Sequence, residues 1–261
     1  MTREIKKIAS ITSILLVLNS ITLGEHELVT DRPDQTESSR VIPVGLIQIE
    51  SGWVYTLNNN TGAGQQISRF PSSLVRIGVL ANVELRLAVD GGYWEKTDGV
   101  KRRGSGDVGV GTKIHLRDEV NRKPETALLA FISIPTHDRK LLGEELDAAF
   151  RLTFSYTFSD RLSSGFNTGV SWSAQKEENT LAEFNYTAAL GINLVSGVGM
   201  FVEIFGDIPL NSSGTGFHSL DGGFTVIIRE NLQWDFSGGI SLTEQAGEGF
   251  IGLGFSWRLP R

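Results

Sequence analysis

Hydrophobic and polar residues alternate along most of this chain with the two-residue period of β-strands. The alternation is clear over residues 47–56, 84–93, 107–116, 150–158, 184–193 and 232–240. Residues 126–134 alternate poorly, so the pattern gives their strand no orientation. With the segments between these, the pattern predicts roughly a dozen strands of about ten residues each.

The connections between the predicted strands alternate in length. Short links fall at residues 81–83, 117–124, 159–161, 195–197 and 229–231, and longer polar links fall at 58–69, 95–105, 137–145, 174–181, 207–219 and 243–249. Outer-membrane barrels have this arrangement, with short periplasmic turns and longer external loops. The sequence therefore predicts an all-β fold, a closed antiparallel transmembrane β-barrel of about 12 strands with both termini on the periplasmic side.

The first 24 residues have the organisation of a secretory signal peptide. Arg3, Lys6 and Lys7 precede an apolar stretch over residues 8–18 that is too short to span a bilayer, and cleavage is expected near Gly24. A short buried helix is the alternative interpretation. The expected division is a signal peptide over 1–24, a periplasmic or lumen-inserted segment over 25–45 and a barrel over 46–261. Export of a barrel predicts the outer membrane of a Gram-negative bacterium as its location.

Composition and charge narrow the function classes. A mean hydropathy of −0.06 and 21% charged residues look soluble, but a barrel hides its lipid-facing surface in the alternation. The net charge of −6 becomes about −8 without the leader, which argues against a nucleic-acid partner. The chain has no cysteine, so it has no disulfide and no thiolate metal site.

Charged residues on the strand faces indicate which face is inside. A Lys or Arg on the lipid face at the bilayer midplane costs about 2–4 kcal/mol, so charged faces should line a wet lumen. A soluble barrel would place apolar residues inside instead. The leader, the loop lengths and aromatic residues near the ends of apolar faces favour the membrane barrel; these aromatic residues are Trp53, Tyr55, Tyr93, Phe158, Trp172 and Trp257. The residues expected to face lipid include Leu85, Val110, Phe154, Leu190 and Trp234, and the charged residues expected to line the lumen are Arg76, Glu84, Arg86, Asp90, Asp107, Lys113, Arg151, Glu203, Asp221 and Asp235.

A charge-rich segment, residues 30–39, precedes the first predicted strand. It carries Asp31, Arg32, Asp34 and Glu37. One interpretation is a solvated periplasmic tail, and the other is a segment that folds into the lumen and narrows the pore. In the second case Arg32 should pair with a lumen carboxylate, because a planar guanidinium suits carboxylate geometry. The candidate partners are Asp107, Asp221 and Asp235.

No residue pattern indicates an active site. The four histidines, at positions 26, 115, 137 and 218, lack metal-ligand spacing, and His115 falls on the predicted lumen face. His218 beside Ser219 resembles a catalytic pair only in composition. The glycines at 104 and 106 precede no predicted helix that could bind a phosphate. We therefore predict no enzyme activity, no catalytic residue, no metal site and no cofactor.

Several motifs resemble one known family. They are the decapeptide Thr-Asp-Arg-Pro-Asp-Gln-Thr-Glu-Ser-Ser over 30–39, the glycine-rich Gly106–Gly111 with Lys113, Phe201–Glu203 with Gly206, Leu220–Gly223 and Asn231–Asp235. Over about residues 29–259 the chain resembles the family described as putative MetA-pathway of phenol degradation, a set of exported outer-membrane barrels often called transporters. It departs from that family at Gln35, where an aromatic residue is common, and in its final residues, where Phe255 and Trp257 lie near a non-aromatic end.

The pattern and the resemblance favour an outer-membrane channel for passive uptake or efflux of small molecules. Only the family description suggests aromatic compounds. The alternatives are a structural or binding barrel with a blocked lumen, and a membrane-embedded lipase-type enzyme. The expected partners are outer-membrane lipid, a small-molecule solute and the barrel assembly machinery. The residues expected to line and constrict the pore are the charged lumen set above together with Asp31, Arg32, Asp34 and Glu37.

Overall fold

A computed structural model describes residues 27–58, 64–134, 147–174, 180–243 and 249–259. The expected signal peptide and most of the links at 137–145, 174–181 and 243–249 lie outside these residues. The strands are β1 (Ile47–Asn58), β2 (Gln65–Leu80), β3 (Val83–Thr97), β4 (Val100–Gly104), β5 (Val108–Arg117), β6 (Glu125–Ile134), β7 (Asp147–Ser159), β8 (Leu162–Ala174), β9 (Thr180–Val195), β10 (Val198–Pro209), β11 (Phe217–Arg229), β12 (Leu232–Ser241) and β13 (Gly249–Arg258). No helix of the described residues is long and apolar enough to cross a bilayer.

The strands form one closed antiparallel sheet. β1 pairs with both β2 and β13, and β2 pairs with β3, which closes the ring. β4 and β5 both pair with β3, β4 with residues 93–97 and β5 with residues 83–89, so they share one position in the wall. The wall therefore has twelve positions, and the prediction of a closed barrel of about twelve strands is confirmed.

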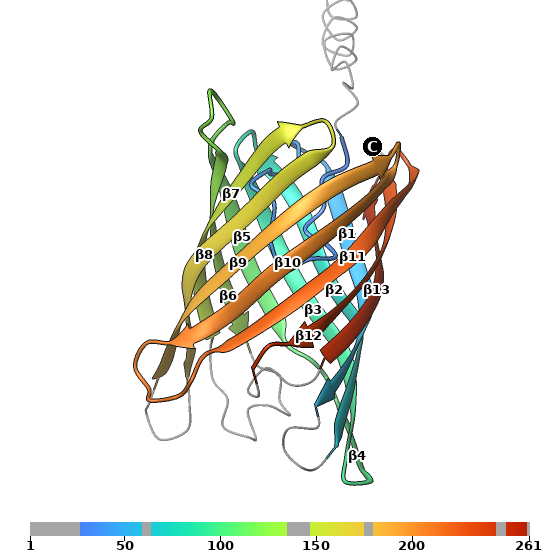
Figure 1. The fold of residues 1–261 in the computed structure, drawn as a ribbon, viewed down its shortest axis with the longest axis vertical. Helices are drawn as coiled ribbons and strands as arrows, with labels where there is room; N and C mark the ends of the chain where they lie inside the picture. The colour runs from blue at the N-terminus through green and yellow to red at the C-terminus, as the bar shows by residue number, and fades with distance from the viewer. Residues whose placement is uncertain (1–26, 59–63, 135–146, 175–179, 244–248, 260–261) are drawn as a thin grey trace, which may run out of the picture.

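The two ends of the barrel differ as the loop lengths predict. Short turns such as Ala81–Asn82 and Asp160–Arg161 lie at one end, and the longer connections lie at the other. Both ends of the described chain are at the short-turn end, where the amide of Leu259 donates to the carbonyl of Ile47. Figure 1 shows the end of the chain, marked C, at the top and the β4 hairpin at the bottom.

The polarity of the wall is that of a transmembrane barrel. The outer surface exposes apolar side chains, for example Leu85 (48%), Val110 (47%) and Trp234 (47%). The inner face holds Arg76 and Lys113, which are fully buried. The reversed arrangement of a soluble barrel is therefore absent from the described wall.

The packing of β6 explains why its sequence pattern does not indicate which of its faces points into the lumen. Ala127 and Leu129 on its inner face are buried, and Phe131 on the same face lies over Gly109 and Gly111 of β5. The lumen face of β6 is therefore apolar from Ala127 to Phe131, like its lipid face. Alternation of polarity disappears when a bulky inner ring fills the space that two glycines leave.

Three sequence expectations need correction at the long-loop end. Residues 95–105, interpreted as a loop, form most of the β3–β4 hairpin, whose polar sequence suits a ribbon extending into water. Proline has no N–H to donate, so it is expected at the end of a strand, but Pro71 lies inside β2, at an irregularity where it has no register partner on β1 or β3. Tyr93 is expected from the sequence among the aromatic residues of the lipid face. Its register partner is Arg69, whose side chain lines the lumen, so Tyr93 lies on the lumen face as well.

Candidate functional site: a charged segment inside the barrel

Residues 30–39 lie inside the barrel, and we call them the plug segment. The segment has no regular secondary structure, so its backbone donors need partners from elsewhere. Strand carboxylates supply them: the Asp31 amide donates to Glu50 Oε2 (2.9 Å) and the Gln35 amide donates to Glu203 Oε2 (2.7 Å). Just beyond the segment, the Ile42 amide donates to Glu84 (2.8 Å). Acidic residues on the wall thus fix the path of an irregular chain.

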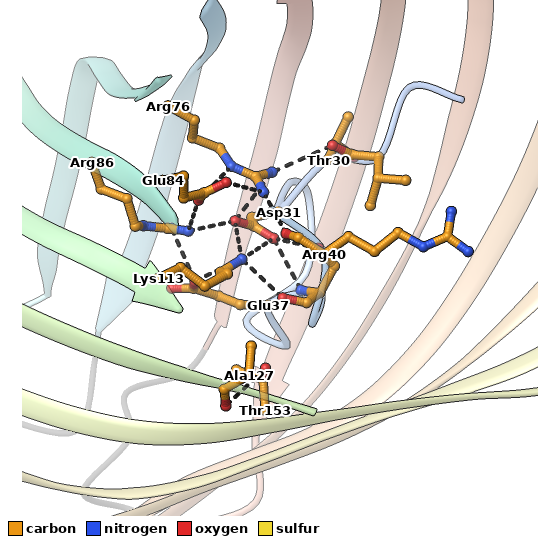
Figure 2. A network of polar contacts seen from close by, with 12 residues as sticks. Thr30, Asp31, Glu37, Arg40, Arg76, Glu84, Arg86, Lys113, Ala127 and Thr153 are labelled. Atoms are coloured by element: carbon orange, nitrogen blue, oxygen red, sulfur yellow. Dashed lines mark hydrogen bonds and ion pairs between the residues drawn. The ribbon is translucent and has the colours of Figure 1, made fainter. Parts of the chain in front are cut away.

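Asp31 lies at the centre of a buried charge cluster contributed by β2, β3 and β5. Its carboxylate is 2.8 Å from Lys113 Nζ, 2.7 Å from Arg86 Nη1 and 3.2 Å from Arg76 Nη1. Figure 2 shows the three cations converging on Asp31 from the strands. Glu37 adds a second plug carboxylate, 2.9 Å from Arg86. The plug segment thus supplies anions to a cationic part of the wall.

The wall itself holds these cations in place. Arg76 and Arg86 are direct cross-strand partners, a like-charge arrangement that destabilises a sheet unless it is compensated. Glu84 accepts from both guanidiniums at 3.0 Å, and Glu50 accepts from Arg76 at 3.0 Å. Two wall carboxylates face three wall cations, so Asp31 supplies charge that the wall lacks.

The ionisation of Asp31 follows from this setting. Burial alone would raise the pKa of its carboxyl. The three cations Arg76, Lys113 and Arg86 outweigh burial and hold the pKa well below its ordinary value. Asp31 is therefore a carboxylate at neutral pH.

Arg32 points to the opposite wall. Its guanidinium contacts Asp235 of β12, with Nη2 2.9 Å and Nε 3.2 Å from the two carboxylate oxygens. Asp235 is one of the three partners named from the sequence. The guanidinium fits into a slot made by Gly52 and Gly254, which are register partners on β1 and β13. A Cβ at Gly254 would lie 2.3 Å from the Arg32 side chain, so only glycine leaves room for it.

We expect Gly254→Ala to displace Arg32 and loosen the plug segment. The new methyl would overlap the guanidinium, and overpacking typically costs about 1–3 kcal/mol. Single-channel conductance should rise above that of the wild type. Gly92→Ala is the matched control, because its methyl would meet nothing closer than 3.4 Å. Equal conductance in the two variants would contradict the interpretation that Gly254 leaves the room that holds Arg32 in place.

The third contact region is acidic. Thr36 Oγ1 bonds to Glu203 Oε1 (2.5 Å) and to Thr187 Oγ1 (2.6 Å). Glu203 and Asp221 are register partners on β10 and β11, so two carboxyl groups lie together on this part of the wall. Burial raises the pKa of Asp34 well above its ordinary value, and the negative charge of Glu203 and Asp221 raises it further. The protonated carboxyl of Asp34 is therefore more stable in this acidic part of the lumen than its carboxylate is.

The raised pKa of Asp34 predicts a pH dependence of plug docking. The docked state binds the proton more tightly than the released state. Asp34 therefore favours docking most at pH values below its ordinary pKa, and that contribution is lost as the pH rises through the raised pKa. Conductance should increase over this interval, and Asp34→Asn should flatten the increase. A pH titration of single-channel conductance on both proteins tests this, and an identical slope in the variant would contradict it.

Three cavities surround the plug segment. One of about 460 Å³ lies beside β2, β3, β5, β6 and β7, and one of about 570 Å³ opens toward the short turns of β7–β9. The third, of about 530 Å³, lies toward the long-loop end and is lined by the rings of Phe205, Phe217 and Phe250. Glu37 lines both the first and the second cavity, and Asp34 lines both the second and the third. The plug segment therefore separates spaces that open toward opposite ends of the barrel.

Every charged residue predicted to line the lumen lies on the inner face. Asp90, Asp107 and Arg151 line the first cavity but are not part of the Asp31 cluster. Sequence reasoning did not identify Glu50, which is buried on the inner face, as a site residue. It also missed the small hydroxyl residues that hold the plug segment: Thr36, Ser39, Thr153 and Thr187. Such residues are too common in strands to stand out in a sequence.

The sequence pair His218–Ser219 does not form a catalytic pair. Ser219 lines the lumen, whereas His218 lies on the other face of β11 and contacts the Tyr186 hydroxyl (2.7 Å). His115, at the short-turn end, contacts the Ser39 carbonyl and Asp118. Among the described residues no group of three or more His, Cys, Asp or Glu side chains has a geometry that could hold a metal ion.

Comparisons with known proteins agree with this architecture. Residues 30–259 match the family described as putative MetA-pathway of phenol degradation. No curated protein matches. Among solved structures, an outer membrane channel from Pseudomonas putida F1 has a TM-score of 0.61 at 9% identity, with 85% of this chain and 98% of that chain covered. The NanC porin has a TM-score of 0.56 at 8% identity over 82% of this chain and all of that chain. The translocator domain of the autotransporter NalP from Neisseria meningitidis has a TM-score of 0.52 at 9% identity, covering 84% of this chain and 90% of that chain. These likenesses establish the fold.

Proposed function

The chain belongs to the putative MetA-pathway of phenol degradation family, and from this premise we propose that it is a passive channel for small molecules in the outer membrane of a Gram-negative bacterium. Its expected signal peptide would direct export, and the barrel assembly machinery would insert residues 46–261 in the membrane. The observation that carries the proposal is a polar lumen whose cavities lie on both sides of a short, non-covalently held segment.

The plug segment sets the constriction in this proposal. Asp31, Arg32, Asp34 and Glu37 divide the lumen, and a solute must pass beside them or displace them. Charged groups around a narrow passage give a pore its selectivity. The cavity toward the long-loop end adds three phenyl rings, which favour contact with a flat apolar solute. We therefore propose small aromatic compounds as the preferred solutes, and no catalytic role.

The dense contacts of the plug segment favour one alternative, a binding or structural barrel whose lumen stays blocked. Liposome swelling with the full barrel separates the two functions. A channel gives solute influx above that of empty liposomes, and deletion of residues 30–39 increases it. A blocked barrel gives no influx until residues 30–39 are deleted.

The preference for aromatic solutes needs a separate measurement. Benzoate and cyclohexanecarboxylate carry the same charge and have similar size, and they differ in aromaticity. We expect faster benzoate influx, and Phe217→Leu should reduce the difference between the two. Equal influx of both acids through the wild-type barrel would contradict aromatic selectivity while leaving the channel function intact.

A further inference from the structure

The β3–β4 hairpin carries a basic surface outside the barrel wall. Its pairing register places Lys96 opposite Lys101 and Trp94 opposite Arg103. Direct cross-strand partners share one face of a sheet, as do residues two apart along a strand. Trp94, Lys96, Lys101 and Arg103 therefore form one face of the hairpin, which we call the basic face.

The basic face points away from the lumen. Trp94 is the register partner of Ser68 on β2, and Ser68 accepts a hydrogen bond from Trp53 Nε1 (2.7 Å). Trp53 lies outside the barrel, because Val54 and Thr56 on the other face of β1 line a lumen cavity. The basic face is thus continuous with the lipid-facing surface of β1 and β2.

The cations on this face have no acidic partners in the described chain. Lys96, Lys101 and Arg103 are exposed and form no ion pair with a described residue. The hairpin has two carboxylates: Asp98 lies in its turn and forms no ion pair with a described residue, and Glu95 lies on the other face. There it is the register partner of Arg102 and accepts from Gln65 (2.8 Å) and Thr97 (2.9 Å). Lys96 and Lys101 face each other directly, which destabilises a sheet unless an anion is shared between them.

The position of the hairpin indicates which kind of anion these cations would bind. It projects from the end opposite both termini, which is the outer-leaflet side of the membrane (Figure 1). Trp94 and Phe70 beside it are each 53% exposed, as expected for side chains at the boundary between acyl chains and head groups. The outer leaflet of a Gram-negative outer membrane is built from lipid A, which carries phosphate groups on its sugars. Lysine and arginine side chains beside a membrane recognise phosphate head groups.

We propose that the basic face of the β3–β4 hairpin is a binding site for the phosphorylated head group of lipid A. The phosphate would lie between Lys96, Lys101 and Arg103. Trp94 and Phe70 would contact the upper acyl chains. Such a site would fix the depth and rotation of the barrel in the outer leaflet, independently of what passes through the lumen.

The test uses the purified full barrel in detergent and native mass spectrometry with added lipid A. The test variant replaces Lys96, Lys101 and Arg103 with glutamine. The control variant replaces Arg122, Lys123 and Arg161 with glutamine, because these exposed cations lie at the short-turn end and their loss changes the net charge equally. Far-UV circular dichroism establishes that each barrel is folded, and Lys101→Gln alone serves if the triple variant does not fold.

We expect wild-type and control barrels to retain bisphosphorylated lipid A, and the test variant to bind it on the order of 100-fold more weakly. Dephosphorylated lipid A should bind all three barrels weakly. Equal losses in the test and control variants would mean non-specific attraction and would overturn the proposal. Displacement of lipid A by inorganic phosphate at equal concentration would also overturn it, because the site would then recognise a free anion. Neither result bears on conduction through the lumen.

Discussion

Replacing Asp31 with asparagine should release the plug segment and raise the single-channel conductance to that of a barrel lacking residues 30–39. Asparagine keeps the shape of the side chain but removes the charge that Arg76, Arg86 and Lys113 share. Removing one partner from a buried ion pair costs about 3–5 kcal/mol, because the remaining charges stay buried without compensation. A neutral hydrogen bond contributes only about 0.5–1.5 kcal/mol, so no single neutral hydrogen bond that remains in the plug segment offsets this loss.

Glu27→Gln is the matched control for this experiment. It makes the same chemical change a few residues earlier, where Glu27 pairs with Arg40 and the two side chains are 76% and 51% exposed. Exposed pairs contribute about 0–1 kcal/mol, so its conductance should equal that of the wild type. If Asp31→Asn also conducts like the wild type while the barrel remains folded, neutral hydrogen bonds hold the plug segment and the charge cluster does not.

The architecture could be predicted from the sequence because two of its causes are local. A charge on the lipid face is costly, which forces the alternation in strands such as β3 and β5. Short turns at one end leave a second signal in the spacing. These two signals, alternating polarity and loop length, are missing or misleading in two parts of the wall. β6 has apolar residues on both faces because Phe131 packs over glycines of β5, and the β3–β4 hairpin lies beyond the membrane and needs no apolar face.

The candidate site could be predicted only in part. The charges of residues 30–39 and of the inner strand faces are visible in the sequence, and their complementarity suggested that Arg32 meets a carboxylate such as Asp235. The sequence did not contain the pairing of Asp31 with Arg76, Arg86 and Lys113, because it depends on how far the segment enters the lumen. The slot at Gly52 and Gly254 was also invisible, since it exists only where β1 and β13 meet in register.

Exchanging the two charges, Asp31→Arg together with Arg32→Asp, should expel the plug segment as completely as its deletion. These neighbours face opposite walls, Asp31 the cations of β2, β3 and β5, and Arg32 the carboxylate of Asp235. The exchange keeps length, composition and net charge but places like charges together on both walls. The uncompensated charge on each wall costs about 3–5 kcal/mol. A glutamyl endopeptidase should then cleave after Glu37, a bond present in both proteins, in folded barrels of the variant. Conductance should match that of the deletion variant. A tail that lay free in the periplasm would show neither change, so wild-type conductance and the same protease sensitivity in both proteins would refute an electrostatic plug.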